Sequence, residues 1–194
     1  MQPPPKLETL DDLLAQARHY AEFCMRNSGK MSPTLFLIGA DGPLMFVPAS
    51  LADADEKDNF ATTARLMCIA HGAIACVMAL EAWAKFAKPG ETLDLTEAPS
   101  EAFDRREFVV LTGESCAAQK QKFLPIIRSD NGKFFALGES ETPGMDELKG
   151  RFAQILPTKV PDDATRQVAQ ALLKVKGVNV ANPGTTVRLP RSRR

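Results

Sequence analysis

The sequence lacks the motifs by which most nucleotide enzymes and many hydrolases are recognised. It has no Gly-x-Gly-x-x-Gly and no Gly-Lys-Ser/Thr phosphate loop, so the usual sites for dinucleotides and nucleoside triphosphates are missing. It also has no Gly-x-Ser-x-Gly nucleophile elbow, because Gly113-Glu-Ser115 and Gly138-Glu-Ser140 lack the second glycine. These absences disfavour a nucleotide enzyme or a serine hydrolase of ordinary type, and no catalytic residue is assigned.

Cysteine and histidine are scarce, with four and two residues among 194. The cysteines are isolated, which predicts reduced thiols rather than a disulfide framework. The nearest approach to a metal site is Cys68, His71 and Cys76, but no Cys-x-x-Cys pair or acidic residue completes a ligand set. Cys116 is the thiol expected at the surface, and no base for it is recognisable. We therefore predict no metal and no cofactor.

An excess of charge of one sign is also missing, because 24 Lys and Arg balance 24 Asp and Glu. No overall field therefore favours nucleic acid or an anionic membrane. No run approaches the roughly 18 consecutive apolar residues of a membrane span, and the start Met-Gln-Pro-Pro-Pro-Lys has no apolar core of the signal-peptide kind. We expect a cytoplasmic protein without a membrane partner.

Hydrophobic periodicity supplies the fold prediction. Thr9 and Asp12 form a capping-box pattern before a helix that Gly29 ends, and a second helix is expected from about Asp55 to His71. Strand patterns occupy residues 34–38, 44–47, 76–86, 107–112, 122–128 and 133–137. This order predicts an α+β fold with a mostly antiparallel sheet of five to six strands and with helices gathered on one face.

The chain is expected to consist of one domain and two ends. Residues 1–8 are predicted to be flexible, residues 9–177 to form a single α+β domain, and residues 178–194 to be a basic, disordered tail. The domain closes with a predicted helical hairpin over 142–177, whose first helix runs through Leu156. This hairpin either packs on the sheet or projects as an oligomerisation arm. Contact with nucleic acid is predicted only through the tail, at Arg188, Arg191, Arg193 and Arg194.

Charged residues and the single tryptophan lie in two strand patterns that flank the longest connection of the domain. Glu81 and Trp83 share one face of the first strand, and Arg105 and Arg106 lead into the second. Antiparallel pairing would bring the two arginines close to Glu81. These four are the candidate binding residues, because Trp and Arg are enriched as binding anchors. The alternative is a set of cross-strand ion pairs, with Trp83 covered by the C-terminal helices.

The same strand pair disfavours catalysis. Glu107 is expected to pair with Lys85, and cations beside Glu81 and Glu107 would keep both carboxylates ionised, unlike a general acid and base pair. The acidic connection at 87–104 is longer than most unstructured loops, so it is either functional or disordered.

Three short motifs in this part of the chain occur together: Glu81-Ala-Trp83, Pro99-Ser100 and Asp104-Arg-Arg-Glu107, the last leading into a strand. The set resembles a group of uncharacterised proteins from bacteria and their phages. The resemblance is confined to the middle of the chain and implies a bacterial or mobile-element setting. It implies no activity, cofactor or catalytic residue.

The sequence as a whole favours a non-enzymatic protein-binding or assembly domain, whose partner is a second copy or another protein. The face of Glu81, Trp83 and Arg106, together with loop 87–104, would contact that partner, in an oligomer. One alternative is a small-ligand sensor or an enzyme with a pocket under the same loop. A further alternative is nucleic-acid attachment through the basic tail.

Overall fold

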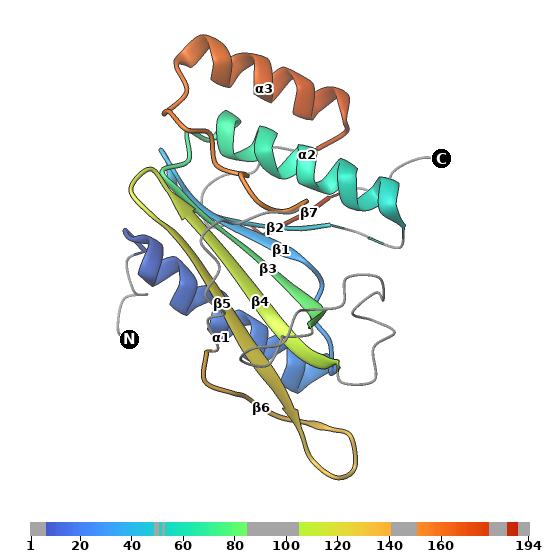
Figure 1. Cartoon of the computed structure of the whole chain (residues 1–194). Coiled ribbons are helices and arrows are strands. Elements are labelled where there is room, and N and C mark those ends of the chain that lie inside the picture. The colour runs from blue at the N-terminus through green and yellow to red at the C-terminus, as the bar shows by residue number, and fades with distance from the viewer. Residues whose placement is uncertain are drawn as a thin grey trace, which may run out of the picture.

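Three helices and seven strands make up the computed structural model, which describes residues 7–48, 51, 53–84, 105–140, 151–178 and 186–189. The order along the chain is α1 (Leu10–Ser28), β1 (Thr34–Gly39), β2 (Gly42–Pro48), α2 (Ala54–Ala70), β3 (Ala75–Ala84), β4 (Arg106–Ser115), β5 (Gln119–Arg128), β6 (Phe134–Leu137), α3 (Asp163–Val175) and β7 (Thr186–Leu189). The strands form one sheet, with helices on both of its sides (Figure 1).

The spatial order of the strands is β6-β5-β4-β3-β1-β2-β7. β1 to β6 pair antiparallel with their neighbours, which confirms the predicted α+β fold with a mostly antiparallel sheet. β7 was not predicted, since its residues fall in the tail expected to be disordered, and it pairs parallel with β2. Arg188 belongs to this strand, whereas Arg191, Arg193 and Arg194 lie outside the described residues.

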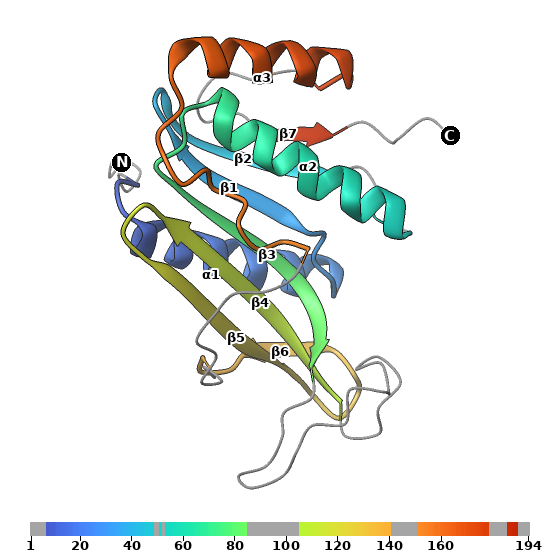
Figure 2. The same cartoon turned by 45° about the horizontal axis from the view of Figure 1, so that its top comes forward.

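The helices cover both faces of the sheet, so the prediction that they gather on one face is wrong. The reason lies in β1, whose six residues are all buried. Leu35 and Leu37 pack in the core beside α2, while Phe36 and Ile38 pack in the core beside α1. A strand that is apolar on both sides needs a cover on each. Turned forward, the molecule shows α1 behind the sheet and α2 in front of it (Figure 2).

Local sequence signals fix the ends of the first helix as predicted. The Thr9 hydroxyl accepts the backbone N–H of Asp12 at 3.1 Å, and the Asp12 carboxylate accepts the backbone N–H of Thr9 at 2.9 Å. The bond from the Thr9 hydroxyl is the main cause that lowers the pKa of Asp12. Gly29 ends the helix with φ of 69°, a value that glycine adopts without steric cost.

The first helix of the predicted hairpin is wrong within the part that the structure describes. Residues 151–160 are irregular, and backbone groups of residues 151 and 153–156 are bonded to side chains of Arg65 and Glu114. Arg65 donates to the carbonyl oxygens of Arg151, Ala153 and Gln154, at 3.1 to 3.2 Å. These bonds take the place of the i to i−4 bonds that a helix would make. Residues 141–150 lie outside the described part of the chain.

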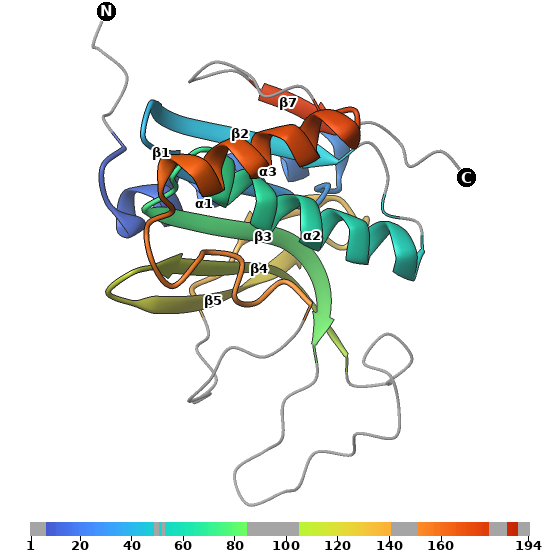
Figure 3. The ribbon, with the colours of Figure 1, turned by 90° about the horizontal axis from the view of Figure 1, so that it is seen from above.

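The second helix of the predicted hairpin is α3, which Asp162 caps and Gly177 follows with φ of 72°. It packs alongside α2, as the view from above shows (Figure 3). Ala169 and Leu173 are buried against α2, and the side-chain amide of Gln170 donates to the Ala70 carbonyl at 3.3 Å. α3 is therefore held by α2 rather than by the sheet itself.

Candidate functional site

Trp83 lies near the end of β3, on the face that α1 covers further back along the strand. Val77 and Ala79 of β3 are buried in the core beside α1. Glu81 and Trp83 continue the same face, because alternate residues of a strand point to one side. Trp83 is 43% exposed there. Since α3 packs on the other side of the sheet, the alternative in which the C-terminal helices cover Trp83 is wrong.

Glu81 holds the segment of the chain that follows α1. Its carboxylate accepts the backbone N–H of Met31, which follows the helix. Burial raises the pKa of Glu81 and the charge of Glu107 adds to the rise, while the Met31 N–H and the cations Arg128 and Lys30 oppose it. Its partner across the strands is Val109, so the register does not place the arginines opposite it.

Glu107 is bound to Arg128 of β5. The expected pairing of Glu107 with Lys85 lies outside the described residues. The Arg128 Nε and one terminal nitrogen donate to the two carboxylate oxygens of Glu107 at 2.8 and 2.7 Å. Such a forked pair fixes both side chains. It raises the pKa of Arg128 and lies beside Trp83, which is directly opposite Glu107 in the ladder.

The two arginines of the candidate set are on opposite faces. The Arg105 guanidinium stacks 4.7 Å from the centre of the Trp83 ring. Arg106 is paired with Ala84 and its guanidinium is 5.0 Å from the centre of the Phe108 ring, in the core cluster on the other face. The predicted approach of Arg106 to Glu81 is therefore wrong. Glu81, Trp83 and Arg105, with the Glu107–Arg128 pair, form what we call the Trp83 patch.

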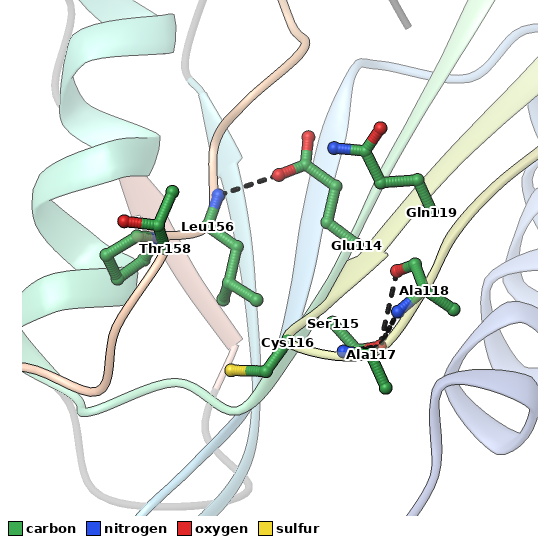
Figure 4. Close-up of a pocket in the computed structure, with 9 residues that line it drawn as sticks. Glu114, Ser115, Cys116, Ala117, Ala118, Gln119, Leu156 and Thr158 are labelled. Carbon is green, nitrogen blue, oxygen red and sulfur yellow. Dashed lines mark hydrogen bonds between the residues drawn. The ribbon is translucent and has the colours of Figure 1, made fainter. Parts of the chain in front are cut away.

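Glu114 is a buried charge that the sequence prediction missed. It is 3% exposed at the end of β4, and its two carboxylate oxygens accept the backbone N–H groups of Ile155 and Leu156 at 3.1 and 2.9 Å. Figure 4 shows the carboxylate reaching across to Leu156. The only sequence signal was an acidic residue three positions after the apolar run Phe108–Leu111. The carboxylate fastens the irregular segment to the sheet.

A cavity of about 430 Å³ adjoins Glu114, between the β4–β5 turn and the segment at 156–158. The exposed Cys116 lies in this turn, as predicted for the surface thiol. The Ser115 hydroxyl holds the turn by accepting the N–H of Ala118 at 3.0 Å (Figure 4). This is the opposite end of β4 from loop 87–104, which lies outside the described residues, so the predicted pocket under that loop is a different place.

Cys68 and Cys76 are buried together, and all four cysteines are free. A hydrogen bond with Cys68 and burial raise the pKa of the Cys76 thiol well above its usual range, which keeps it protonated and a weak nucleophile. His71 packs instead against Phe46, with ring centres 5.8 Å apart. Within the described ranges, no group of three His, Cys, Asp or Glu residues could hold a metal ion.

His71 should make stability depend on pH. The residue is 6% exposed, and its Nε2 is buried without a hydrogen-bond partner among the described residues. Burial lowers the pKa of His71 and Arg166 lowers it further, while Asp41 partly opposes them. In the unfolded chain, where the pKa of His71 is near 6.5, the imidazole therefore binds a proton more readily than in the folded protein. We expect stability to be full above that pH and to fall as the pH drops below it.

The expected slope is at most about 1.4 kcal/mol per pH unit. It can be measured by urea unfolding at pH values from about 7.5 down to 5. His71→Gln should remove this part of the slope, whereas His19→Gln, a change at an exposed position, should keep it. Equal slopes in the two variants would contradict the assignment to His71.

No helix in the described part of the chain is long and apolar enough to cross a membrane.

Glu81, Trp83 and Arg105 are brought together on one face, and Arg106 is separated from them. Comparison with known protein families, curated proteins and solved structures finds no match for this chain.

Proposed function

We propose that the chain is a non-enzymatic protein-binding or assembly domain, which contacts its partner with the Trp83 patch. The observation that carries this proposal is the half-exposed Trp83 ring with the Arg105 guanidinium stacked on it. Tryptophan and arginine are enriched at the energetic centres of protein interfaces, because tryptophan offers a large rigid apolar surface and arginine a planar cation that stacks on aromatic rings and donates hydrogen bonds at its edge.

The charges of the patch indicate what kind of partner suits it. Glu107 and Arg128 neutralise each other, and the Glu81 carboxylate is bonded to the Met31 backbone. Arg105 contributes a planar cation whose N–H groups lie at its edge, around the face that stacks on Trp83. A protein segment whose apolar side chain packs on the exposed part of the Trp83 ring would complement this arrangement. The partner is thus a protein surface, either of a second copy or of another chain.

Photo-crosslinking tests the proposal. A photoreactive residue replaces Trp83 in the full chain, produced in its native cells, and a matched probe replaces Phe135, which is 69% exposed on β6. We expect a discrete protein adduct from position 83, reduced at least about fivefold by Arg105→Ala, and none of the same mass from position 135. Identical adducts from both positions, or none from position 83, would contradict the proposal.

A further inference from the structure

The cavity beside Glu114 has the size and the mixed lining of a small-ligand site. Its volume of about 430 Å³ lies within the range of about 300 to 1,000 Å³ that ligand pockets have. Leu156 and Pro157 give it an apolar side, while Gln119 and Thr158 add polar groups to its lining. Such pockets bind a ligand by apolar contact and orient it with a few polar groups. The feature that selects the ligand is the Glu114 carboxylate.

This carboxylate has acceptor positions that the fold leaves unused. Its two oxygens offer about four lone-pair positions, and the amides of Ile155 and Leu156 take two of them. Among the residues that the structure describes, no Lys or Arg forms an ion pair with Glu114. The residue is 3% exposed, and a buried negative charge is stabilised by a cation that also donates hydrogen bonds to it. A cationic ligand in the cavity would supply both.

The groups around the carboxylate favour an ammonium group over a metal ion. A metal ion needs several ligands, and the described residues offer no group of three His, Cys, Asp or Glu that could hold one. A primary ammonium group has three N–H donors and needs only acceptors. Gln119 is directly opposite Glu114 in the ladder, and Thr158 lies on the facing segment (Figure 4). Each carries a side-chain oxygen that can accept a hydrogen bond.

We propose that this cavity binds a small primary alkylamine through the Glu114 carboxylate. The ammonium group donates to Glu114 and to the side-chain oxygens of Gln119 and Thr158. The carbon chain of the amine packs on Leu156 and Pro157. This site lies at the opposite end of β4 from the Trp83 patch, so it is separate from the protein contact proposed there. A short amine has few atoms with which to gain free energy, so its dissociation constant is in the millimolar range.

A titration of the full chain with n-butylammonium chloride at constant ionic strength tests the proposal. We expect saturable NMR shifts of the backbone amides at 114–119 and 156–158. Cys116, an exposed thiol in the cavity lining, serves as a second reporter. At saturation its alkylation by iodoacetamide should slow at least about threefold, because reaction requires access to the thiol. The half-buried Cys24 on α1 should react at an unchanged rate.

Three variants test the contacts. Glu114→Gln removes the charge and should weaken binding of the amine at least about tenfold. Because this variant is also expected to lose stability, Thr158→Val, at an exposed position, provides a second test and should weaken binding about two- to fivefold. Glu139→Gln, the matched control, removes an exposed carboxylate outside the cavity and should leave the dissociation constant unchanged.

Matched probes test the chemistry of the ligand. Butyltrimethylammonium has no N–H donor and butanesulfonate has the opposite charge, so both should bind at least about tenfold more weakly than butylammonium. The proposal is overturned by equal binding of butyltrimethylammonium, by unchanged binding in Glu114→Gln, or by the absence of saturable shifts up to about 50 mM butylammonium. Tighter binding of Nα-acetyl-lysine methylamide would overturn the assignment to a free amine and favour a lysine side chain of a protein.

Discussion

Replacing Glu114 by alanine should lower the free energy of unfolding by about 2 to 6 kcal/mol, because each buried N–H left without an acceptor costs about 1 to 3 kcal/mol. The two donors are the backbone amides of Ile155 and Leu156, which are 2% and 8% exposed as residues. The variant removes their acceptor and leaves the segment tied to the domain by Arg65 and by its apolar side chains. Urea unfolding followed by circular dichroism measures the loss.

Two further variants test whether the loss of stability comes from the Glu114 carboxylate itself. Glu114→Gln keeps one acceptor oxygen and should cost about half as much as the alanine variant. Glu139→Ala removes an exposed carboxylate and should change stability by no more than about 0.5 kcal/mol. If Glu114→Ala were as stable as Glu139→Ala, the two amide bonds would have no structural role and the segment would be held by other contacts.

Gly39→Ala should destabilise the protein by about 1 to 3 kcal/mol, the usual range for overpacking. A Cβ at Gly39 would lie 2.9 Å from the backbone oxygen of His71, at the end of α2. That oxygen accepts the N–H of Ala40 at 2.8 Å, and the N–H of Ile74 is bonded to Ile38 next to it. The backbone cannot yield without losing bonds between the end of β1 and the α2–β3 turn. Thermal and urea unfolding measure the effect.

Gly113→Ala is the matched control, since Gly113 also lies in a strand without a positive φ. The nearest atoms to its added Cβ would be terminal methyl groups of Leu10 and Leu14, at 3.0 and 3.3 Å. Such groups move by rotation about side-chain bonds, so the cost should be smaller than at Gly39. Equal losses in the two variants would show that any added methyl group destabilises this sheet. The contact with the His71 backbone oxygen would then not explain the loss at Gly39.

The helices and strands that the sequence predicts correctly are those with signals inside the element. Thr9 and Asp12 reciprocally cap α1, and Gly29 supplies the conformation that ends it, so a few neighbouring residues determine each end. The six antiparallel strands likewise follow from short apolar patterns. The run of apolar residues in β1 also indicated burial on both faces of the strand, although the fold prediction did not use this signal.

The candidate site was only partly predictable, because it depends on pairing between distant segments. A two-residue turn fixes the register of a hairpin, but the connection from residue 85 to 104 leaves that between β3 and β4 open. The actual register places Val109 opposite Glu81, and Glu107 forms an ion pair with Arg128 on a third strand. The failure at 151–156 has the same origin, since its apolar spacing suits a helix while Glu114 and Arg65 capture its backbone.

The capture of the segment at 151–156 has a consequence for the order of folding. Its anchors are 41 and 42 residues away at Glu114 and 86 to 89 residues away at Arg65, so closing these loops has an entropic cost that local contacts do not share. The segment has no repetitive structure of its own to form beforehand. We expect α2 and the β3–β4 pair to assemble first, and α3 to dock late, as the least protected layer in amide hydrogen exchange.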